Sequence, residues 1–345
     1  MSDNLWTEAA GEPVAPSPPP AEPRRRRWPL LLVAVLVLAG IAFWVTRGGG
    51  ATEAGVLNVG SQRGGTKALM LASGALDGAP YSVVWSEFPA AQNLLEAIGA
   101  GAVDVGVAGD APFQFAYQSG QPVRAVAALA SRPRPSGSLA ILVPAHSAIR
   151  DAVGLRGKRI ATTRGSVGHY LLLRVLEANH LTPADVQIIF LSPGDTKAAF
   201  DSGSIDAWST WSPYVPTVLA SGGRILVDGA TYLSGYAFDA ANASSAITKK
   251  TLLADFLRRE ARALLWAKAH QQAYADVLAR ETGLPPAIAL YQVQHQPLVR
   301  VPIDDALKAE ERDVVDHFRK AGALAGNQPL DAAYLPLDQG DAHGD

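Results

Sequence analysis

Between residues 56 and 228, short apolar runs alternate with segments whose apolar residues recur three or four positions apart. The short runs, such as Val56–Gly60, Tyr81–Phe88 and Gly101–Gly109, are bounded by glycine, proline or polar residues, which predicts strands. The periodic segments that follow them predict helices. Regular alternation of strands and helices is typical of α/β folds, and we expect mostly parallel sheets.

The half of the chain after Pro144 repeats the plan of the first half. The segments EAIGAGAVD (96–104) and AAFDSGSID (198–206) each end a helix at glycine and enter a strand through an apolar residue and aspartate. Two similar α/β lobes predict a ligand site between them, at the carboxyl ends of the strands. We expect the first part of lobe one over 55–143, lobe two over 144–228, the return to lobe one with the C-terminal helices over 229–335, and a disordered tail over 336–345.

The first 46 residues differ in composition from the rest of the chain. Residues 1–27 are rich in proline and predict a disordered cytoplasmic tail, which ends in four arginines. Residues 28–46 contain the uncharged stretch Trp28–Val45, which as a helix is ~27 Å long, close to the ~30 Å hydrocarbon core of a bilayer. The arginines before it place the N-terminus in the cytoplasm. We expect an uncleaved transmembrane anchor or a cleaved signal peptide, with the remainder in the periplasm.

Charge and composition exclude several classes of protein. The chain has 30 Lys and Arg against 32 Asp and Glu, a net charge of -2, without the basic domain typical of nucleic-acid binding. It has no cysteine, which excludes disulfides, thiolate metal sites and a cysteine nucleophile. The histidines lack the spacing of metal ligands. We therefore expect no nucleic-acid partner, no metal and no cofactor.

The stretch Lys158–Leu176 predicts a site for an anion. A short strand with β-branched residues runs through a glycine turn into a segment with helical periodicity, and Ser166 is a good N-cap for that helix. The first N–H groups of a helix have no partner within it, and the helix dipole favours negative charge there. Gly165 and Gly168 let a ligand approach the backbone, and Ser166 and His169 add side-chain donors.

Several segments, in this order and spacing, resemble the periplasmic substrate-binding proteins of ABC importers for aliphatic sulfonates. That group lies beside the binding proteins for taurine, nitrate and thiamine precursors. The segments that carry the resemblance are GSQRGG (60–65), WSEF (85–88), GAVDVGVAGDAPFQFAY (101–117), LRGKRIATTRGSVGHYLL (155–172) and DAWSTWSPY (206–214). The resemblance implies a two-lobed type II periplasmic-binding-protein fold with hinged lobes. It also implies a monomeric protein that is not an enzyme and that hands its ligand to a membrane permease with an ATPase subunit.

A sulfonate is a permanent anion with three acceptor oxygens, so its recognition needs converging N–H and O–H donors more than a fully buried cation. Turns at the ends of strands could supply those donors. In one of them Gln62 offers its amide, and in another Asp110 caps a helix while the Ala111 N–H donates. The candidate ligand-binding residues are Gln62, Glu87, Gly109, Asp110, Ala111, Gly165, Ser166, His169, Trp208 and Trp211.

Three of these candidates have roles other than donation. Trp208 and Trp211 resemble apolar walls for an alkyl tail, although packing in a core is common for tryptophan. Glu87, at the end of a predicted strand, could orient donors or gate the cleft. The sequence departs from the family pattern at Ala111, where threonine is usual, and at Ser212, where aspartate is frequent.

Other functions stay open at this point. Within the fold, the ligand could be taurine, nitrate, bicarbonate or a thiamine precursor, because the sequence does not give the size of the pocket. Desulfinases in the superfamily need a cysteine nucleophile, which this chain lacks. A hydrolase built on Ser166 and His169 would lack both a G-x-S-x-G elbow and an orienting acid. A membrane-tethered sensor is disfavoured because the cytoplasmic tail is too short and too rich in proline for a signalling domain.

Overall fold

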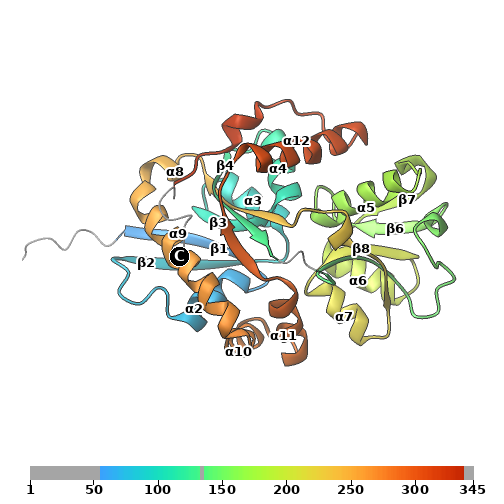
Figure 1. The fold of residues 1–345 in the computed structure, drawn as a ribbon, viewed down its shortest axis with the longest axis horizontal. Coiled ribbons are helices and arrows are strands. Elements are labelled where there is room, and N and C mark those ends of the chain that lie inside the picture. The colour runs from blue at the N-terminus through green and yellow to red at the C-terminus, as the bar shows by residue number, and fades with distance from the viewer. Residues whose placement is uncertain (1–54, 133–135, 338–345) are drawn as a thin grey trace, which may run out of the picture. The chain divides into compact units, whose positions relative to one another are not determined.

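Two sheets organise the computed structural model, which describes residues 55–132 and 136–337. Among these residues, the first sheet has the spatial order β11 (Leu298–Val301), β4 (Val123–Ser131), β10 (Tyr236–Asn242), β3 (Val105–Gly109), β1 (Gly55–Gln62) and β2 (Tyr81–Phe88). The second sheet has the order β7 (Gln187–Phe190), β6 (Arg159–Thr162), β8 (Ala207–Trp211), β5 (Leu139–Val143) and β9 (Arg224–Asp228). Figure 1 shows these strands with their helices.

Both sheets are mixed, and not mostly parallel as the sequence pattern predicts. Strand β1 runs parallel to β2 and β3, and β6 runs parallel to β7 and β8. Strand β10 lies antiparallel between β3 and β4, and β5 lies antiparallel between β8 and β9. These two are the strands by which the chain enters the other sheet, so each begins where its neighbours end. Because β5 belongs to the second sheet, the expected boundary after residue 143 falls one strand late.

Helices cover both faces of each sheet, and we call a sheet with its helices a lobe. Alternate residues of a strand point to opposite faces, so each sheet contributes to two apolar clusters. The first sheet has α2 (Gly65–Ser73) and α9 (Lys250–Ala269) on one face, and α3 (Ala91–Gly99) and α4 (Asp110–Gln118) on the other. The second has α5 (Val167–Ala178) on one face, and α6 (Pro193–Asp201) and α7 (Tyr214–Ala220) on the other.

The remaining helices are short or belong to the C-terminal part of the first lobe. The α-helices among them are α8 (Ser245–Thr248), α10 (Gln271–Thr282), α11 (Pro286–His295) and α12 (Asp305–Lys320). Single 3-10 turns lie at Val153–Leu155, Pro183–Asp185, Gly229–Thr231 and Leu330–Ala333.

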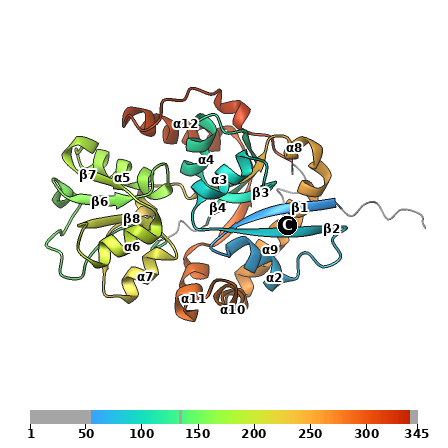
Figure 2. The ribbon, with the colours of Figure 1, turned by 180° about the vertical axis from the view of Figure 1, so that it is seen from behind.

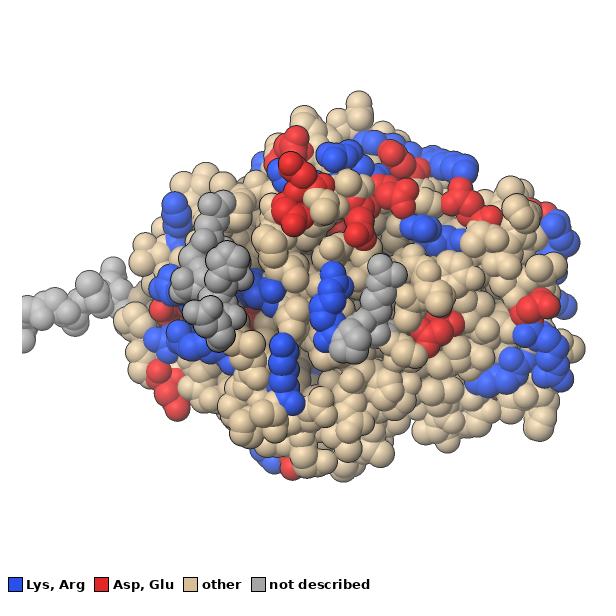
Figure 3. Space-filling model, in the orientation of Figure 1, with Lys and Arg blue, Asp and Glu red and all other residues tan. Residues whose placement is uncertain are grey.

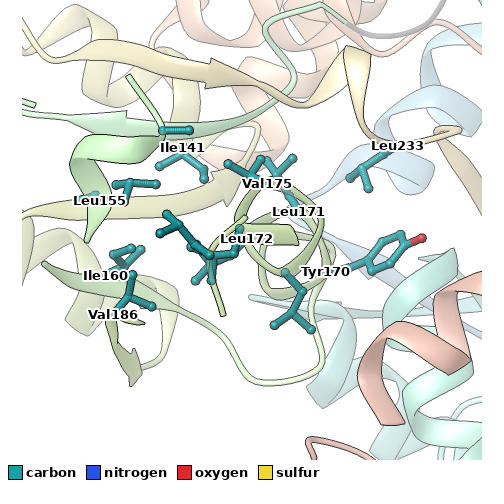
Figure 4. Close-up of a cluster of buried hydrophobic side chains, with 14 of the residues drawn as sticks. Ile141, Leu155, Ile160, Tyr170, Leu171, Leu172, Val175, Val186 and Leu233 are labelled. Atoms are coloured by element: carbon teal, nitrogen blue, oxygen red, sulfur yellow. The ribbon is translucent and has the colours of Figure 1, made fainter. Parts of the chain in front are cut away.

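Helix α5 forms because its sequence supplies both a cap and an apolar face. Ser166 precedes the helix in an extended conformation, and its side chain accepts a hydrogen bond from the N–H of His169. Leu171, Leu172 and Val175 then recur at helical spacing and are fully buried against the second sheet (Figure 4). Burying such a side chain contributes roughly 1.5–3 kcal/mol. The start of α5 is therefore held in place by its cap and by the core beneath it.

Helix α12 contacts both lobes. It lies beside α4 of the first lobe (Figures 1 and 2), where the Phe318 ring centroid is 5.5 Å from that of Phe115. Toward α5, Arg174 donates to Asp313 at 3.0 Å, and the Nε2 atom of His317 lies 2.6 Å from a carboxylate oxygen of Glu177. Figure 3 shows acidic and basic side chains intermixed over this helix. Such exposed pairs each contribute about 0–1 kcal/mol, so the burial of Val314, Val315 and Phe318 contributes more to the contact between α12 and the lobes.

The described part of the C-terminal segment differs from the predicted disordered tail. The N–H groups of Leu335 and Leu337 donate to the carbonyls of Ala125 and Val126 on β4, both at 2.9 Å, so the chain is still paired two residues into the predicted tail. The rest of that tail and the predicted segments 1–27 and 28–46 lie outside the described residues. Within 55–132 and 136–337, none of the helices combines the length and the apolar character needed to cross a membrane.

Candidate functional site

A cavity of about 250 Å³ lies where strands of both sheets end. Of the predicted residues, Gln62 lines it at the end of β1, Gly109 at the end of β3, Ser166 at the start of α5 and Trp211 at the end of β8. We call this part of the cavity the cleft; its lining also includes Arg63, Gln92, Val167 and Ser212. These residues therefore lie together at the carboxyl ends of strands, where a ligand site is expected in α/β proteins.

The start of α5 borders the cleft through Ser166 and Val167, whereas Gly168 is buried and does not line it. Among the described residues, the N–H of His169 is taken by the Ser166 hydroxyl at 3.0 Å, while those of Val167 and Gly168 have no acceptor. A Cβ atom on Gly168 would come within 2.5 Å of the Ser209 carbonyl oxygen, so only glycine lets the helix begin this close to β8. Unpaired amides and the helix dipole make this end of α5 suited to an anion.

The start of α4 does not offer the donor that the sequence suggests. The predicted cap is wrong, because Gly109 is the N-cap residue and Asp110 is the first residue of the helix. The Asp110 carboxylate accepts the N–H of Ala111 at 2.6 Å. Both residues are buried and neither lines the cavity. Burial and the negative charge of Glu310 raise the pKa of Asp110 to about 7. An anionic ligand at Ala111 would have to displace a carboxylate that already occupies the site.

The starts of α4 and α5 meet across the cleft, and two glycines make this possible. A Cβ atom on Gly109 would lie 2.7 Å from the Cγ1 of Val167, and one on Gly165 would lie 2.6 Å from the Cγ of Phe115. Gly165 also has a φ of +68°, in the left-handed region that favours glycine. Gly165 therefore supports the turn and the contact between the lobes without lining the cavity.

Arg63 stands beside Gln62 in a turn predicted to supply donors, and it lines the cleft although it is not among the candidate ligand-binding residues. It follows Gln62 with a φ of +48°, its guanidinium carbon lies 5.8 Å from the Tyr214 ring centroid of the second lobe, and it is partly buried. Its Nε atom is buried and has no acceptor among the described residues. The sequence alone does not distinguish this arginine from a solvated loop residue, because its contact with Tyr214 joins two distant parts of the chain.

Gln62 and Glu87 hold the turn that carries Arg63. The Gln62 side-chain amide donates to the Val107 carbonyl, which keeps it against the cleft wall. Glu87, on the neighbouring strand, accepts the N–H of Gly64 at 2.9 Å. Glu87 is exposed and does not line the cavity, so its contact is with the turn and not with the space a ligand would fill.

The structure places His169 and Trp208 away from the cleft. The Nδ1 atom of His169 accepts the Gly165 N–H at 3.2 Å, and its ring packs edge-on against Phe190 beside a separate cavity. Burial and the charge of Arg164 lower the pKa of His169 to about 4, so the ring is neutral at pH 7. Trp208 is 1% exposed, so it packs in the core of the second lobe and does not form a wall of the cleft.

Trp211 gives the cleft an apolar wall. Its ring lies edge-on to Tyr214, with centroids 5.8 Å apart, and it is partly exposed to the cavity. The neighbouring Ser212 also lines the cavity, and its hydroxyl has no partner among the described residues. No cluster of His, Asp or Glu within 55–132 and 136–337 could hold a metal ion. The lining of the cleft thus combines the Arg63 side chain, the N–H of Val167 and the Ser212 hydroxyl with the aromatic wall of Trp211.

Comparison with known proteins identifies relatives of this chain. Residues 86–274, more than half of the chain, match the family described as NMT1/THI5 like. The chain is 32% identical to the putative aliphatic sulfonates-binding protein of Escherichia coli K12 over 76% of this chain and 83% of that protein. It is also 32% identical to the taurine-binding periplasmic protein of E. coli K12, over 43% of this chain and 44% of that protein.

Solved structures show the same fold. The alkanesulfonate-binding protein SsuA from Xanthomonas axonopodis pv. citri, bound to MOPS, superposes with a TM-score of 0.75 at 29% identity, covering 81% of this chain and 98% of that one. The desulfurization enzyme DSZB shares the fold at a TM-score of 0.59 and 19% identity, covering 82% of this chain and 96% of that one. From the match over residues 86–274 and the 32% identity, the chain belongs to the NMT1/THI5-like family and has its two-sheet periplasmic-binding-protein fold.

Proposed function

We propose that this protein is the substrate-binding component of an ABC importer for aliphatic sulfonates, which it binds in the cleft between its lobes. The observation that carries the proposal is that Arg63 and Val167, whose N–H has no acceptor among the described residues, line one cavity. Each comes from a different lobe, so an anion held by both would draw the lobes together. The names of the relatives support the same ligand class.

The chemistry of the cleft fits a sulfonate better than other small anions. Three sulfonate oxygens can accept from Arg63, from the amide of Val167 and from the Ser212 hydroxyl, all as charge-assisted hydrogen bonds. Because Arg63 is partly exposed, it keeps some hydration, and pairing it costs less than pairing a fully buried cation. Trp211 then faces the carbon attached to the sulfur.

The lining also favours an alkanesulfonate over taurine. An ammonium group would need an acidic partner, and among the described lining residues the carboxylate is that of Glu260, which is already paired with Arg300 at 2.9 Å. Nitrate would leave the aromatic wall unused. Catalysis has no support in the cleft, because Ser166 caps α5 and His169 faces another cavity.

The proposal extends to location and partners. The protein acts in the periplasm as a monomer and delivers its ligand to a membrane permease with an ATPase subunit. Residues 28–46 tether it to the inner membrane or direct its export. The lobes close on the ligand at the hinge where the chain passes between the sheets. This arrangement serves the uptake of sulfur in organic form.

Binding by the full-length protein tests the ligand class. Isothermal titration should show saturable binding of butanesulfonate and octanesulfonate, with weaker binding of taurine and nitrate. Arg63→Met should lower the affinity about tenfold or more, as expected for a lost charged hydrogen bond. The control is Arg156→Met, which removes a cation from an exposed ion pair with Asp185 on the second lobe and should leave the sulfonate affinity unchanged. Absence of sulfonate binding, or unchanged affinity in Arg63→Met, would refute the proposal.

A further inference from the structure

Helix α9 exposes a row of basic side chains to solvent. The helix packs against the first sheet through buried apolar residues, among them Leu253, Phe256 and Leu257. The exposed residues of α9 that matter here are four cations and a leucine. We call them the basic face, which consists of Lys250, Arg258, Arg262, Leu265 and Lys268. Figure 3 views this side of the molecule and shows basic side chains along α9, apart from the mixed charges over α12.

The charges of the basic face are mostly unpaired. Among the described residues, only Arg258 of the four cations has an ion pair, at 3.2 Å from Asp255. Asp255 is shared with Arg259, at 2.5 Å. The other acid of α9, Glu260, is 1% exposed and is paired with Arg300. The basic face is therefore positive, although the whole chain has a net charge of -2.

Two large apolar side chains lie in solvent beside these charges. Leu265 is 62% exposed, and Ile247, on α8 just before α9, is 73% exposed. A single exposed apolar residue is ordinary on a protein surface. Apolar side chains together with unpaired cations on one helix, however, are the combination by which helices lie on anionic membranes. The apolar groups enter the boundary of the acyl chains, and the cations bind the lipid head groups.

The chain enters the first lobe beside this helix. A Cβ atom on Gly55, the first described residue, would lie 2.5 Å from the Cδ1 of Leu252 in the first turn of α9. The Nζ atom of Lys249 donates to the Val56 carbonyl at 3.0 Å. Residues 47–54 separate Gly55 from the predicted anchor, and a segment of that length spans at most ~30 Å. In a tethered protein, the start of α9 therefore lies within about that distance of the anchor.

We propose that the basic face lies on the anionic lipid surface of the membrane that holds residues 28–46. This inference rests on the tethered form of the proposed function. Each Lys or Arg near an anionic bilayer strengthens the attraction about fivefold, and salt weakens it. Because the tether keeps the helix near the bilayer, a modest attraction is enough to hold it there. Helix α9 packs within the first lobe, so this docking leaves the second lobe free to close on a ligand.

Fluorescent labels at single cysteines test this with the full-length protein in lipid vesicles. The chain has no cysteine, so Leu265→Cys takes an environment-sensitive label on the basic face alone. Val153→Cys, at a position that is 55% exposed on the second lobe, is the control. When the vesicles contain phosphatidylglycerol, the label of Leu265→Cys should shift its emission to the blue and be quenched by lipids with spin-labelled head groups. Phosphatidylcholine alone should give neither effect, and the label of Val153→Cys should be unchanged in both.

Two pairs of charge variants separate the action of the basic face from that of net charge. Lys250→Gln with Arg262→Gln removes two unpaired cations from the face and should lower the ratio of membrane-bound to free label about 25-fold. Neither residue has an ion pair among the described residues, so the fold should be kept. Arg150→Gln with Arg156→Gln removes two exposed cations from the second lobe and should leave the quenching unchanged.

The outcomes separate this proposal from sulfonate binding. Equal signals in the two kinds of vesicle would overturn the docking, and a blue-shifted label in both would mean that another part of this chain or a second copy covers the face. Equal weakening by both pairs of variants would also overturn it, because net charge alone would then be responsible. Cleavage that removes residues 28–46 from the exported protein would overturn it as well. Failure of sulfonates to bind would overturn the ligand class and leave the docking intact.

Discussion

Replacing Gly109 by alanine tests whether the contact between α4 and α5 belongs to the ligand-bound state. Gly109 has a φ of -60° and a ψ of 161°, which alanine adopts without strain, so the added methyl group acts through space alone. It would lie 2.7 Å from the Cγ1 of Val167, closer than real Cβ contacts come. Gly109 belongs to the first lobe and Val167 to the second, so separating the lobes relieves the clash.

The size of the effect follows from the cost of overpacking, about 1–3 kcal/mol. If the lobes meet only when ligand is bound, the whole cost falls on binding, and Gly109→Ala lowers the affinity for octanesulfonate by about 5- to 150-fold. The free energy of unfolding of the ligand-free protein should then change by less than about 0.5 kcal/mol. Val167→Ala removes the clashing methyl group and should cost little by itself.

A double-mutant cycle gives the decisive comparison. Isothermal titration of Gly109→Ala, Val167→Ala and the double variant yields the coupling between the two positions, and urea denaturation of the same proteins gives stability. The double variant should regain most of the lost affinity. Unchanged affinity in Gly109→Ala would show that the lobes are not pressed together at this point in the complex. A loss that Val167→Ala fails to restore would place its cause elsewhere.

Three further perturbations address the turn before α5. Ser166→Ala should lower the free energy of unfolding by about 1 kcal/mol and weaken sulfonate binding. Ser166→Asp should keep the cap, but its negative charge should repel the anion and weaken binding. Urea denaturation measures the stability and isothermal titration the affinity, and any other pattern would contradict this role of Ser166. The pKa of His169 is about 4 in the folded protein against 6.5 ordinarily. The unfolded chain therefore binds a proton at this residue before the folded protein does, and the free energy of unfolding falls as the pH drops from 6.5 toward 4. Between pH 7 and pH 4.5 this loss is about 2–3 kcal/mol, and an equal pH dependence in His169→Gln would contradict it. Gly165→Ala strains φ and brings the new methyl group against Phe115, so it should lower the free energy of unfolding by about 2–4 kcal/mol in the same denaturation assay. Gly157→Ala is the control, because Gly157 has a φ of +72° and nothing within 4 Å of the added Cβ atom. It should cost only the backbone strain, about 1–2 kcal/mol.

The sequence predicts the elements of this fold better than their directions. Local signals were sufficient for the turn at Gly165, for the cap at Ser166 and for the repeated plan of the two halves. The strands Leu139–Val143 and Tyr236–Asn242 are short apolar runs that carry no mark of direction. Their antiparallel pairing follows from where the preceding strands end, which depends on the arrangement of both sheets.

The candidate site was predictable where a single turn decides it and not where distant elements do. Trp208 and Trp211 are three positions apart, which in strand β8 puts them on opposite faces, one in the core and the other toward the cleft. His169 turns away from the cleft because Phe190 and Phe318, from two other elements, pack on its ring. Arg63 lies 5.8 Å from the ring centroid of Tyr214 in the other lobe, a contact that the local sequence around either residue does not reveal.

The placement of β10 has a consequence for the order in which the lobes can be completed. Every strand of the second sheet lies between residues 139 and 228, so that sheet has all its members as soon as this part of the chain is available. The first sheet has β3 and β4 early, but β10 lies between them, and they stay apart until residues 236–242 arrive. As the chain emerges from its N-terminus, the lobe that begins first is the one that must finish last.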